Sequence, residues 1–242
     1  MTVRIAMWSG PRALSTALMR AWENRPDCAV IDEPLYGAYL AETGIDHPMR
    51  EEIIHAMQCD PVLVAQNLVS RTGADIVYQK HMAHHLLPAM GRDWIGALTN
   101  AFLIRDPARV LVSYDRKRPA PELADIGIEQ QWSIFEAEAE RTGSTPAVID
   151  ADDLTADPEG ILNALCARLG VPFEQAMLAW PEGPRASDGV WAPHWYDSVW
   201  RSTGFARGMT ENRQPPSELE RLIAQARPIY EKLAAYRIQA AG

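Results

Sequence analysis

Cysteine is scarce in this sequence, which has only three thiols, Cys28, Cys59 and Cys166, at irregular spacing. An odd, irregular set of cysteines does not form the paired framework that holds small secreted proteins together. We therefore expect reduced thiols and a cytoplasmic location. The 242 residues are enough to bury a large hydrophobic core without covalent cross-links.

Positive charge and long apolar runs are also in short supply. The chain has 23 lysine and arginine residues against 32 aspartate and glutamate residues, which gives a formal net charge of -9. Nucleic acids and anionic membranes bind broad positive patches, so this balance argues against both as partners. No apolar run is long enough to span a bilayer, and the first residues predict a strand instead of a leader peptide.

The beginning of the chain lacks the second glycine and the lysine of the nucleotide-binding pattern G-x-x-x-x-G-K-[ST]. Ala13 and Leu14 occupy those positions, which disfavours an ordinary ATP or GTP site. The segment instead contains a short apolar run from Val3 to Met7, a turn at Ser9-Gly10-Pro11, and a stretch with helical apolar periodicity. This pattern predicts a strand, a tight turn and a helix.

Three polar residues, Arg12, Ser15 and Thr16, fall at the start of that helix. The first turn of a helix has unpaired backbone N–H groups, and its dipole favours a negative ligand. A guanidinium and two hydroxyls add charge-assisted hydrogen bonds suited to phosphate or sulfate. The segment therefore predicts an anion site.

A second segment repeats this strand-to-helix arrangement. The apolar run Phe102 to Ile104 is followed by Arg105, then by Asp106 as a helix N-cap and Pro107 at the first helical position. Ser113 follows Arg105 by eight positions and lies two turns into the predicted helix. Ligands of open parallel sheets bind at the carboxyl ends of the strands, so Arg105 and Ser113 are candidates for a shared crevice.

Together the two segments resemble the sulfotransferase superfamily, whose members use 3′-phosphoadenosine 5′-phosphosulfate (PAPS) as sulfuryl donor. Residues Pro11 to Thr16 are similar to the family's 5′-phosphosulfate loop, P-[KR]-S-G-[ST]-T, and the Arg105 to Ser113 spacing matches its 3′-phosphate motif. The resemblance assigns six residues to the donor: Arg12, Leu14, Ser15, Thr16, Arg105 and Ser113. Leu14 stands where the family has the loop glycine.

The resemblance extends from residue 3 to about residue 175. The segment Tyr78 to Pro88 is similar to the K-x-H-L-P...L-L-P segment of the cytosolic members, although Lys80 and His81 are adjacent here. Residues Ile149 to Val171 resemble the stretch Y-E-D-L...D-P...L...F-L-G. The segment Asp32 to Tyr36 looks most like a divergent branch sometimes called branched-chain aminotransferase-like.

The resemblance implies transfer of a sulfuryl group from PAPS to a hydroxyl of a small-molecule acceptor, without a metal ion. Arg12 would neutralise the leaving phosphate, and Lys80 would reach a bridging or sulfonate oxygen. Two alternatives stay open. The first is a non-catalytic nucleotide-binding relative with a binding or regulatory role, and the second is a small-molecule kinase with a degenerate P-loop.

An alcohol acceptor needs a base, and two residues compete for that role. Glu33 follows the apolar run Cys28 to Ile31, and we expect it at the end of a second strand immediately beside the first. His81 closes the run that begins at Ile76, and imidazole is a good base near neutral pH. We favour Glu33. His84 and His85, which invite a metal interpretation with His81, are expected to begin a surface helix.

Five short apolar runs alternate with helical stretches, which predicts a single three-layer α/β/α domain around a mainly parallel sheet of about five strands. This is the P-loop-NTPase-like fold of the sulfotransferases that the resemblance implies. The runs are Val3 to Met7, Cys28 to Ile31, Ile76 to Tyr78, Phe102 to Ile104 and Ala147 to Ile149. Residues 50–69 predict a helical pair broken near Asp60-Pro61.

The remaining organisation follows from composition. We expect a core over residues 1–175 and an aromatic, lid-like segment over 180–208, in which Arg201 or Arg207 is a candidate contact for the nucleotide. Residues 216–238 predict a C-terminal helical segment, either a helix pair or one helix interrupted near Pro228. A homodimer is compatible with the sequence.

Overall fold

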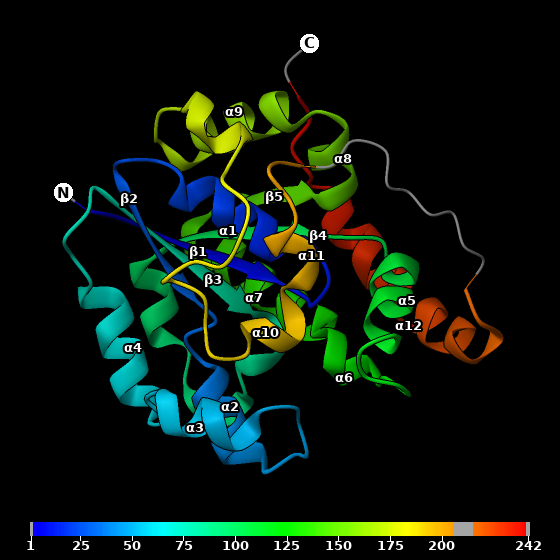
Figure 1. Cartoon of the computed structure of the whole chain (residues 1–242). Helices are drawn as coiled ribbons and strands as arrows, with labels where there is room; N and C mark the ends of the chain where they lie inside the picture. The colour runs from blue at the N-terminus through cyan, green and yellow to red at the C-terminus, as the bar shows by residue number, and fades with distance from the viewer. Residues whose placement is uncertain (1, 206–214, 241–242) are drawn as a thin grey trace.

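A five-stranded parallel sheet is the centre of the molecule (Figure 1). The computed structural model describes residues 2–205 and 215–240, and within them the strand order is β2-β3-β1-β4-β5. The strands are β1 (Val3–Ser9), β2 (Cys28–Asp32), β3 (Ile76–Met82), β4 (Thr99–Ile104) and β5 (Ala147–Asp150). Each of the five apolar runs forms a strand, so the sequence-based prediction of the sheet is confirmed.

Helices connect and cover the strands. Those that precede β4 are α1 (Ser15–Glu23), α2 (Tyr36–Thr43), α3 (Arg50–Ala56), α4 (Pro61–Ser70) and the short 3-10 helices η1 (Ala83–His85), η2 (Pro88–Met90) and η3 (Asp93–Ala97). Those that follow β4 are α5 (Pro107–Asp115), α6 (Leu123–Ile126), α7 (Ile128–Thr142), α8 (Ala151–Ala156), α9 (Pro158–Leu169), η4 (Gln175–Leu178), α10 (Ala192–Trp195), α11 (Asp197–Trp200) and α12 (Ser217–Ala234).

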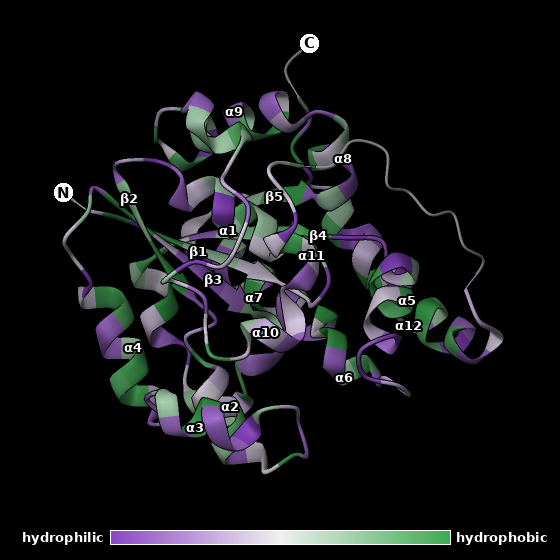
Figure 2. Cartoon of the chain, viewed as in Figure 1, coloured by the Kyte–Doolittle hydropathy of each residue, from purple (hydrophilic) through white to green (hydrophobic). Residues whose placement is uncertain are grey.

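Two hydrophobic layers sandwich the sheet because successive side chains of a strand point to opposite faces. Ile5 and Met7 of β1 pack with apolar residues of α1, α8 and α9 on one face. Ala6 and Trp8 pack with residues of α4, α7 and α12 on the other. The outer helices carry both hydrophobic and hydrophilic residues, as expected for helices with one buried side (Figure 2). The three-layer prediction is therefore confirmed.

The position of β2 differs from the sequence-based expectation. We expected it beside β1, whereas β3 lies between the two and pairs with both. All seven residues of β3 are buried, whereas most of β2 is partly exposed. A strand that is buried on both faces suits the interior of a parallel sheet, so β2 takes the edge.

The expected helical pair at residues 50–69 is observed as α3 and α4. Asp60 is the N-cap of α4, because its carboxylate accepts hydrogen bonds from the backbone N–H groups of Val62 and Leu63. Within residues 2–205 and 215–240, no helix combines the length and apolar content needed to cross a membrane.

The C-terminal segment is one helix, α12, which continues through Pro228. Proline has no N–H group, so the carbonyl of Ala224, one turn earlier, loses its usual helical hydrogen bond. The Pro228 side chain is exposed and contributes little packing to offset this loss.

Pro228→Ala should therefore raise the free energy of unfolding by about 2–3 kcal/mol, which is the helix-interior difference between the two residues. Chemical denaturation measures this change, with the exposed Gln225→Ala in the same helix as the matched control. A stability equal to that of the control variant would contradict an uninterrupted α12.

Candidate active site

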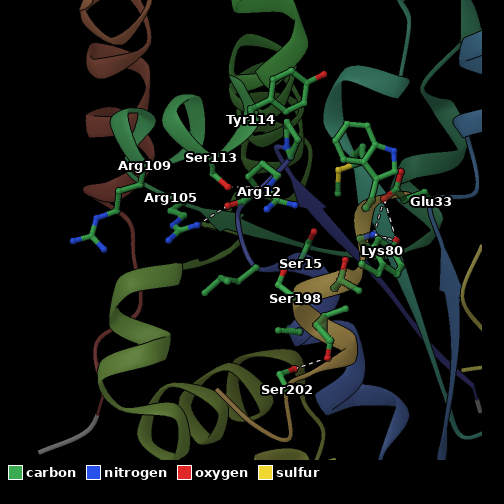
Figure 3. A pocket seen from close by; sticks show the side chains of 18 of the residues that line it. Arg12, Ser15, Glu33, Lys80, Arg105, Arg109, Ser113, Tyr114, Ser198 and Ser202 are labelled. Atoms are coloured by element: carbon green, nitrogen blue, oxygen red, sulfur yellow. Dashed lines mark hydrogen bonds and ion pairs between the residues drawn. The ribbon is translucent and has the colours of Figure 1, made fainter. Parts of the chain in front are cut away.

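A cavity of about 840 Å³ opens at the carboxyl ends of the strands, where parallel sheets bind ligands. Its walls come from the loop after β1, the ends of β2 and β3, the start of α5, and the segment that contains α10 and α11. Figure 3 shows Arg105, Arg109 and Ser113 on one side of the cavity and Glu33 and Lys80 on the other. We call these sides the arginine side and the carboxylate side.

The loop between β1 and α1 has an unusual backbone. Gly10 passes so close to Ile126 that an added Cβ atom would lie 2.6 Å from its carbonyl oxygen. Arg12 and Leu14 both adopt left-handed conformations, with φ values of 57° and 65°. Leu14, which stands where the family pattern has glycine, therefore takes a conformation that glycine adopts without strain, and it does so with a side chain.

Helix α1 begins directly after this loop at Ser15, and Leu14 at its N-cap makes no side-chain capping bond. The N–H groups of the first turn are therefore not satisfied by a cap, which leaves them available to an anion. Ser15 and Thr16 line the cavity beside Arg12. The structure thus brings together the residues that we predicted for the first anion site.

The second predicted anion site meets the first. The Arg105 guanidinium donates from Nη1 to the backbone carbonyl of Arg12 at 2.7 Å, and the Arg12 Nε donates to the hydroxyl of Ser113 at 2.8 Å. Asp106 caps α5 by accepting from the N–H of Ala108, as expected. Two helix starts far apart in the sequence therefore converge on one cavity.

The two guanidinium groups form a concentrated positive region. Among the described residues, neither Arg12 nor Arg105 has a carboxylate within ion-pair distance, and Arg105 Nε is buried without a hydrogen-bond partner. Burial lowers the pKa of both groups, and the charge of Arg12 lowers the pKa of Arg105 further. An anion bound between them would relieve this unfavourable desolvation.

On the carboxylate side, Lys80 is the centre of a buried polar cluster. Its Nζ lies 2.8 Å from Asp32 Oδ1, 2.6 Å from Glu33 Oε1 and 2.6 Å from the hydroxyl of Tyr196. Asp32 and Lys80 are directly paired in the parallel ladder of β2 and β3, so their side chains share one face of the sheet. Strand register thus creates this ion pair.

The environment of Glu33 suits a base. Burial raises the pKa of its carboxyl group, although the charge of Lys80 opposes this change. For Lys80, burial acts in the opposite direction, but the carboxylates of Asp32 and Glu33 prevail and raise its pKa. Glu33 Oε1 accepts a hydrogen bond from Lys80, and Glu33 Oε2 lies 3.9 Å from His85 Nδ1. The backbone of Glu33 is left-handed, with φ 42°, a strain often found at functional sites.

Tyr196 belongs to this cluster, and our sequence analysis did not identify it. Its hydroxyl donates to Asp32 Oδ2 at 2.7 Å and accepts from Lys80 and from the indole N–H of Trp191. The aromatic composition of its segment predicted a folded-back chain, but no motif marks this residue. The contact joins residues 164 positions apart, which only the folded chain brings together.

His81, the alternative base, lies away from the cavity. It is 1% exposed, it stacks on Trp8 with ring centroids 4.3 Å apart, and its Nε2 lies 3.1 Å from Gln79 Oε1. Neighbouring residues of a strand point to opposite faces, so Lys80 faces the cavity and His81 faces the other layer. Burial lowers the pKa of His81 to about 3.

His84 and His85 are buried, which corrects our expectation of a surface helix start. They belong to the short 3-10 helix η1 and line the cavity. His85 stacks on Tyr36, and His84 meets Tyr39 edge to face. In the part of the chain that the structure describes, no cluster of three or more histidine, cysteine, aspartate or glutamate side chains could hold a metal ion.

The segment after Trp180 contacts α1. Buried Arg20 of α1 pairs with Asp188 at 2.5 Å, and Asp188 also accepts from the indole N–H of Trp200. Arg201 lines the cavity, whereas Arg207, the other candidate nucleotide contact, and the end of the expected 180–208 segment lie outside the described residues.

The buried state of His81 predicts a pH-dependent stability. Its folded pKa lies below the unfolded value of about 6.5, so protonation favours the unfolded chain. The stabilising effect is complete above pH 6.5 and is lost as the pH falls toward 3. Between pH 6 and pH 5, the slope of the unfolding free energy against pH should be smaller in His81→Gln than in wild-type protein by about 1 kcal/mol per pH unit. Urea denaturation at each pH measures this slope.

The exposed His55→Gln is the matched control, because its side chain stays hydrated in both states. An unchanged slope in His81→Gln would show that His81 takes up protons in the folded protein, as a solvent-accessible base would.

Comparison with known proteins places this geometry in a family. The family description "Sulfotransferase domain" matches residues 3–237. Branched-chain-amino-acid aminotransferase-like proteins 1 and 2 of Arabidopsis thaliana are 37% and 35% identical to this chain over 233 residues, which is 96% of it. The chain spans only 42% and 41% of the length of these two relatives.

Solved sulfotransferase structures share the fold. The sulfotransferase domain of the Synechococcus PCC 7002 olefin synthase has a TM-score of 0.57 at 19% identity and covers 98% of this chain and 96% of its own. The sulfotransferase domain from the curacin biosynthetic pathway has a TM-score of 0.54 at 17% identity, and the match covers 93% of this chain and 97% of that domain. The Alicyclobacillus acidocaldarius sulfotransferase has a TM-score of 0.55 at 14% identity, and the match covers 98% of this chain and 97% of that protein.

These structural likenesses support the P-loop-like sulfotransferase architecture, and the Arabidopsis relatives agree with the divergent branch indicated by the sequence. Since the family match extends over nearly the whole chain, this protein belongs to the sulfotransferase domain family.

Proposed function

We propose that this protein transfers a sulfuryl group from PAPS to a hydroxyl group of a small-molecule acceptor. The observation that carries the proposal is the convergence of the Arg12 and Arg105 loops on one cavity that also contains Glu33 and Lys80. A donor with anionic groups at both the 5′ and the 3′ position of its ribose needs two separate positive sites. An acceptor hydroxyl needs a nearby base.

The arginine side would bind the donor. Arg12, Ser15 and Thr16, with the N–H groups at the start of α1, suit the 5′-phosphosulfate, and Leu14 contributes its backbone. Arg105 and Ser113 suit the 3′-phosphate. Ser113 already accepts from Arg12 Nε, so both sites share one hydrogen-bonded framework.

The carboxylate side would activate the acceptor. The acceptor oxygen attacks the donor sulfur while Glu33 takes the hydroxyl proton, most directly through Oε2. An O–S bond forms, and the S–O bond to the 5′-phosphate breaks. The bonding electron pair leaves with 3′-phosphoadenosine 5′-phosphate (PAP), whose developing charge Arg12 would stabilise.

Lys80 has a more restricted role in this scheme than the sequence suggested. An ammonium group has three N–H donors, and Asp32, Glu33 and Tyr196 occupy all three at 2.6–2.8 Å. In this arrangement Lys80 orients Glu33 and compensates its charge. Contact with a sulfonate or bridging oxygen requires one of these partners to release it.

Nucleotide selectivity and turnover together test the proposal. PAP should raise the melting temperature, whereas ATP with magnesium should not. Wild-type protein should convert PAPS to PAP with at least one member of a panel of phenols and alcohols. Stabilisation by ATP with magnesium alone would favour the kinase alternative, and PAP binding without PAPS turnover would favour a non-catalytic nucleotide-binding relative.

Removal of the base should separate binding from chemistry. Glu33→Gln should lower kcat by about 100-fold to 10,000-fold and leave PAP affinity unchanged, because the amide cannot accept the proton. In wild-type protein, kcat should fall as the pH decreases. The midpoint of this fall should lie above pH 4.3, the usual pKa of glutamate, because burial raises the pKa of Glu33. Glu51→Gln, at an exposed position outside the cavity, is the matched control. An unchanged kcat in Glu33→Gln would exclude Glu33 as the base.

A further inference from the structure

The wall next to Glu33 consists largely of rings. Tyr36 comes from α2, His84 and His85 from η1, Tyr114 from the end of α5, and Trp195 from α10. These segments lie far apart in the sequence, and folding places all five of these ring side chains on the same cavity.

The rings are mutually packed, and His85 stacks on both Tyr36 and Tyr39. Tyr36 and His85 stack with centroids 4.3 Å apart and an interplanar angle of 17°. Tyr114 and Trp195 are nearly parallel, with centroids 6.3 Å apart and an angle of 12°. Tyr36 and His85 are almost completely buried, so their positions are fixed by packing before any ligand binds. Such walls favour flat ligands, since aromatic pairs gain energy beyond their buried area.

This region also lacks uncompensated charge. Lys80, the ammonium group beside Glu33, is paired with Asp32 and Glu33. Lys117, whose Nζ donates to the carbonyl of His194 next to Trp195, is paired with Asp197. Arg118, which contacts the hydroxyl of Tyr114, is paired with Asp125. Burial lowers the pKa of His84 to about 3 and that of His85 well below its ordinary value, so both imidazoles are neutral at physiological pH. Of the arginines that line the cavity, Arg105 and Arg109 lie on the opposite side (Figure 3). Arg12 donates to Ser113 on that side, and Arg201 is paired with Asp197 at 3.8 Å. A charged acceptor would lose its hydration here without gaining a free counter-ion.

The rings begin immediately beside the base. His85 Nδ1 lies 3.9 Å from Glu33 Oε2, and Tyr36 stacks directly on the His85 ring. A ligand ring packed against these side chains therefore has room for only a very short link to a hydroxyl group at Glu33.

We propose that the acceptor is an uncharged aromatic compound whose hydroxyl group is attached directly to the ring, or through one carbon atom. This inference rests on the proposed function, because it takes Glu33 as the base. The ring would lie against Tyr36, His85 and Trp195, with its hydroxyl at Glu33 Oε2. The hydroxyl oxygen would form the O–S bond as its proton passes to Glu33, and PAP would leave with the electron pair of the broken S–O bond.

Three probes of similar size test the proposal: 2-naphthol, its saturated counterpart decahydro-2-naphthol, and the anion 6-hydroxy-2-naphthoate. Calorimetric titrations use the full chain, once alone and once saturated with PAP. We expect 2-naphthol to bind at least tenfold more tightly than either other probe. Equal binding of the saturated alcohol would exclude an aromatic preference, equal or tighter binding of the anion would exclude an uncharged acceptor, and no binding of any probe would also overturn the proposal.

The titrations distinguish this inference from the proposed function. Should PAP fail to bind while the free protein still selects 2-naphthol, PAPS dependence would be wrong and the aromatic site would stand. Should PAP bind without selection of 2-naphthol, the acceptor class would be wrong and the donor site would stand.

Variants locate the binding site. Trp195→Ala should weaken 2-naphthol binding at least tenfold and change PAP affinity less than twofold. Trp132→Ala is the matched control, because Trp132 stacks on Phe135 outside the cavity. Tyr114→Leu provides a second test should Trp195→Ala fail to fold. Unchanged 2-naphthol affinity in a folded Trp195→Ala or Tyr114→Leu variant would place the probe elsewhere and contradict the proposal.

Discussion

The hydrogen bond from the Arg105 guanidinium to the Arg12 carbonyl joins the two loops on which the proposed donor site depends. It exists because β1 and β4 are neighbours in a parallel sheet, with Ser9 paired to Leu103 near their carboxyl ends. Parallel neighbours deliver their following loops to the same edge of the sheet. Two helix starts, each suited to an anion, are thereby held at a fixed separation around one cavity.

The second constraint is the buried cluster of Lys80, Asp32, Glu33 and Tyr196. Removal of one partner from such a cluster leaves a buried charge uncompensated, which makes the cluster intolerant of change. Tyr196 also ties the aromatic segment after Trp180 to the ends of β2 and β3, and Arg20 ties the same segment to α1 through Asp188. The wall that faces Glu33 is therefore joined to the sheet by polar contacts as well as by packing.

Local signals explain what the sequence predicted correctly. The apolar runs, the Asp106 cap and the start of α1 depend on residues close together in the chain, so the five strands and the two helix starts of the candidate anion sites could be identified in advance. The position of β2 at the sheet edge could not, because strand order depends on burial by distant helices.

The carboxylate side shows the same limit. Glu33 follows an apolar run and Lys80 lies in a segment that resembles the family pattern, so both were identified. Tyr196 reaches Asp32 across 164 residues of sequence and carries no local pattern. The placement of His81 did have a local signal. Because strand residues alternate between faces, adjacent Lys80 and His81 cannot both face one cavity.

Binding of PAP and AMP to Arg105→Ala, measured by titration calorimetry, tests the convergence of the two anion sites most directly. Loss of a charged hydrogen-bond partner should weaken PAP binding by about 10-fold to 100-fold, while AMP, which lacks the 3′-phosphate, should lose less than about threefold. Arg237→Ala, which removes a surface arginine outside the cavity, should change neither affinity. Equal losses for PAP and AMP in Arg105→Ala would contradict a 3′-phosphate site at Arg105.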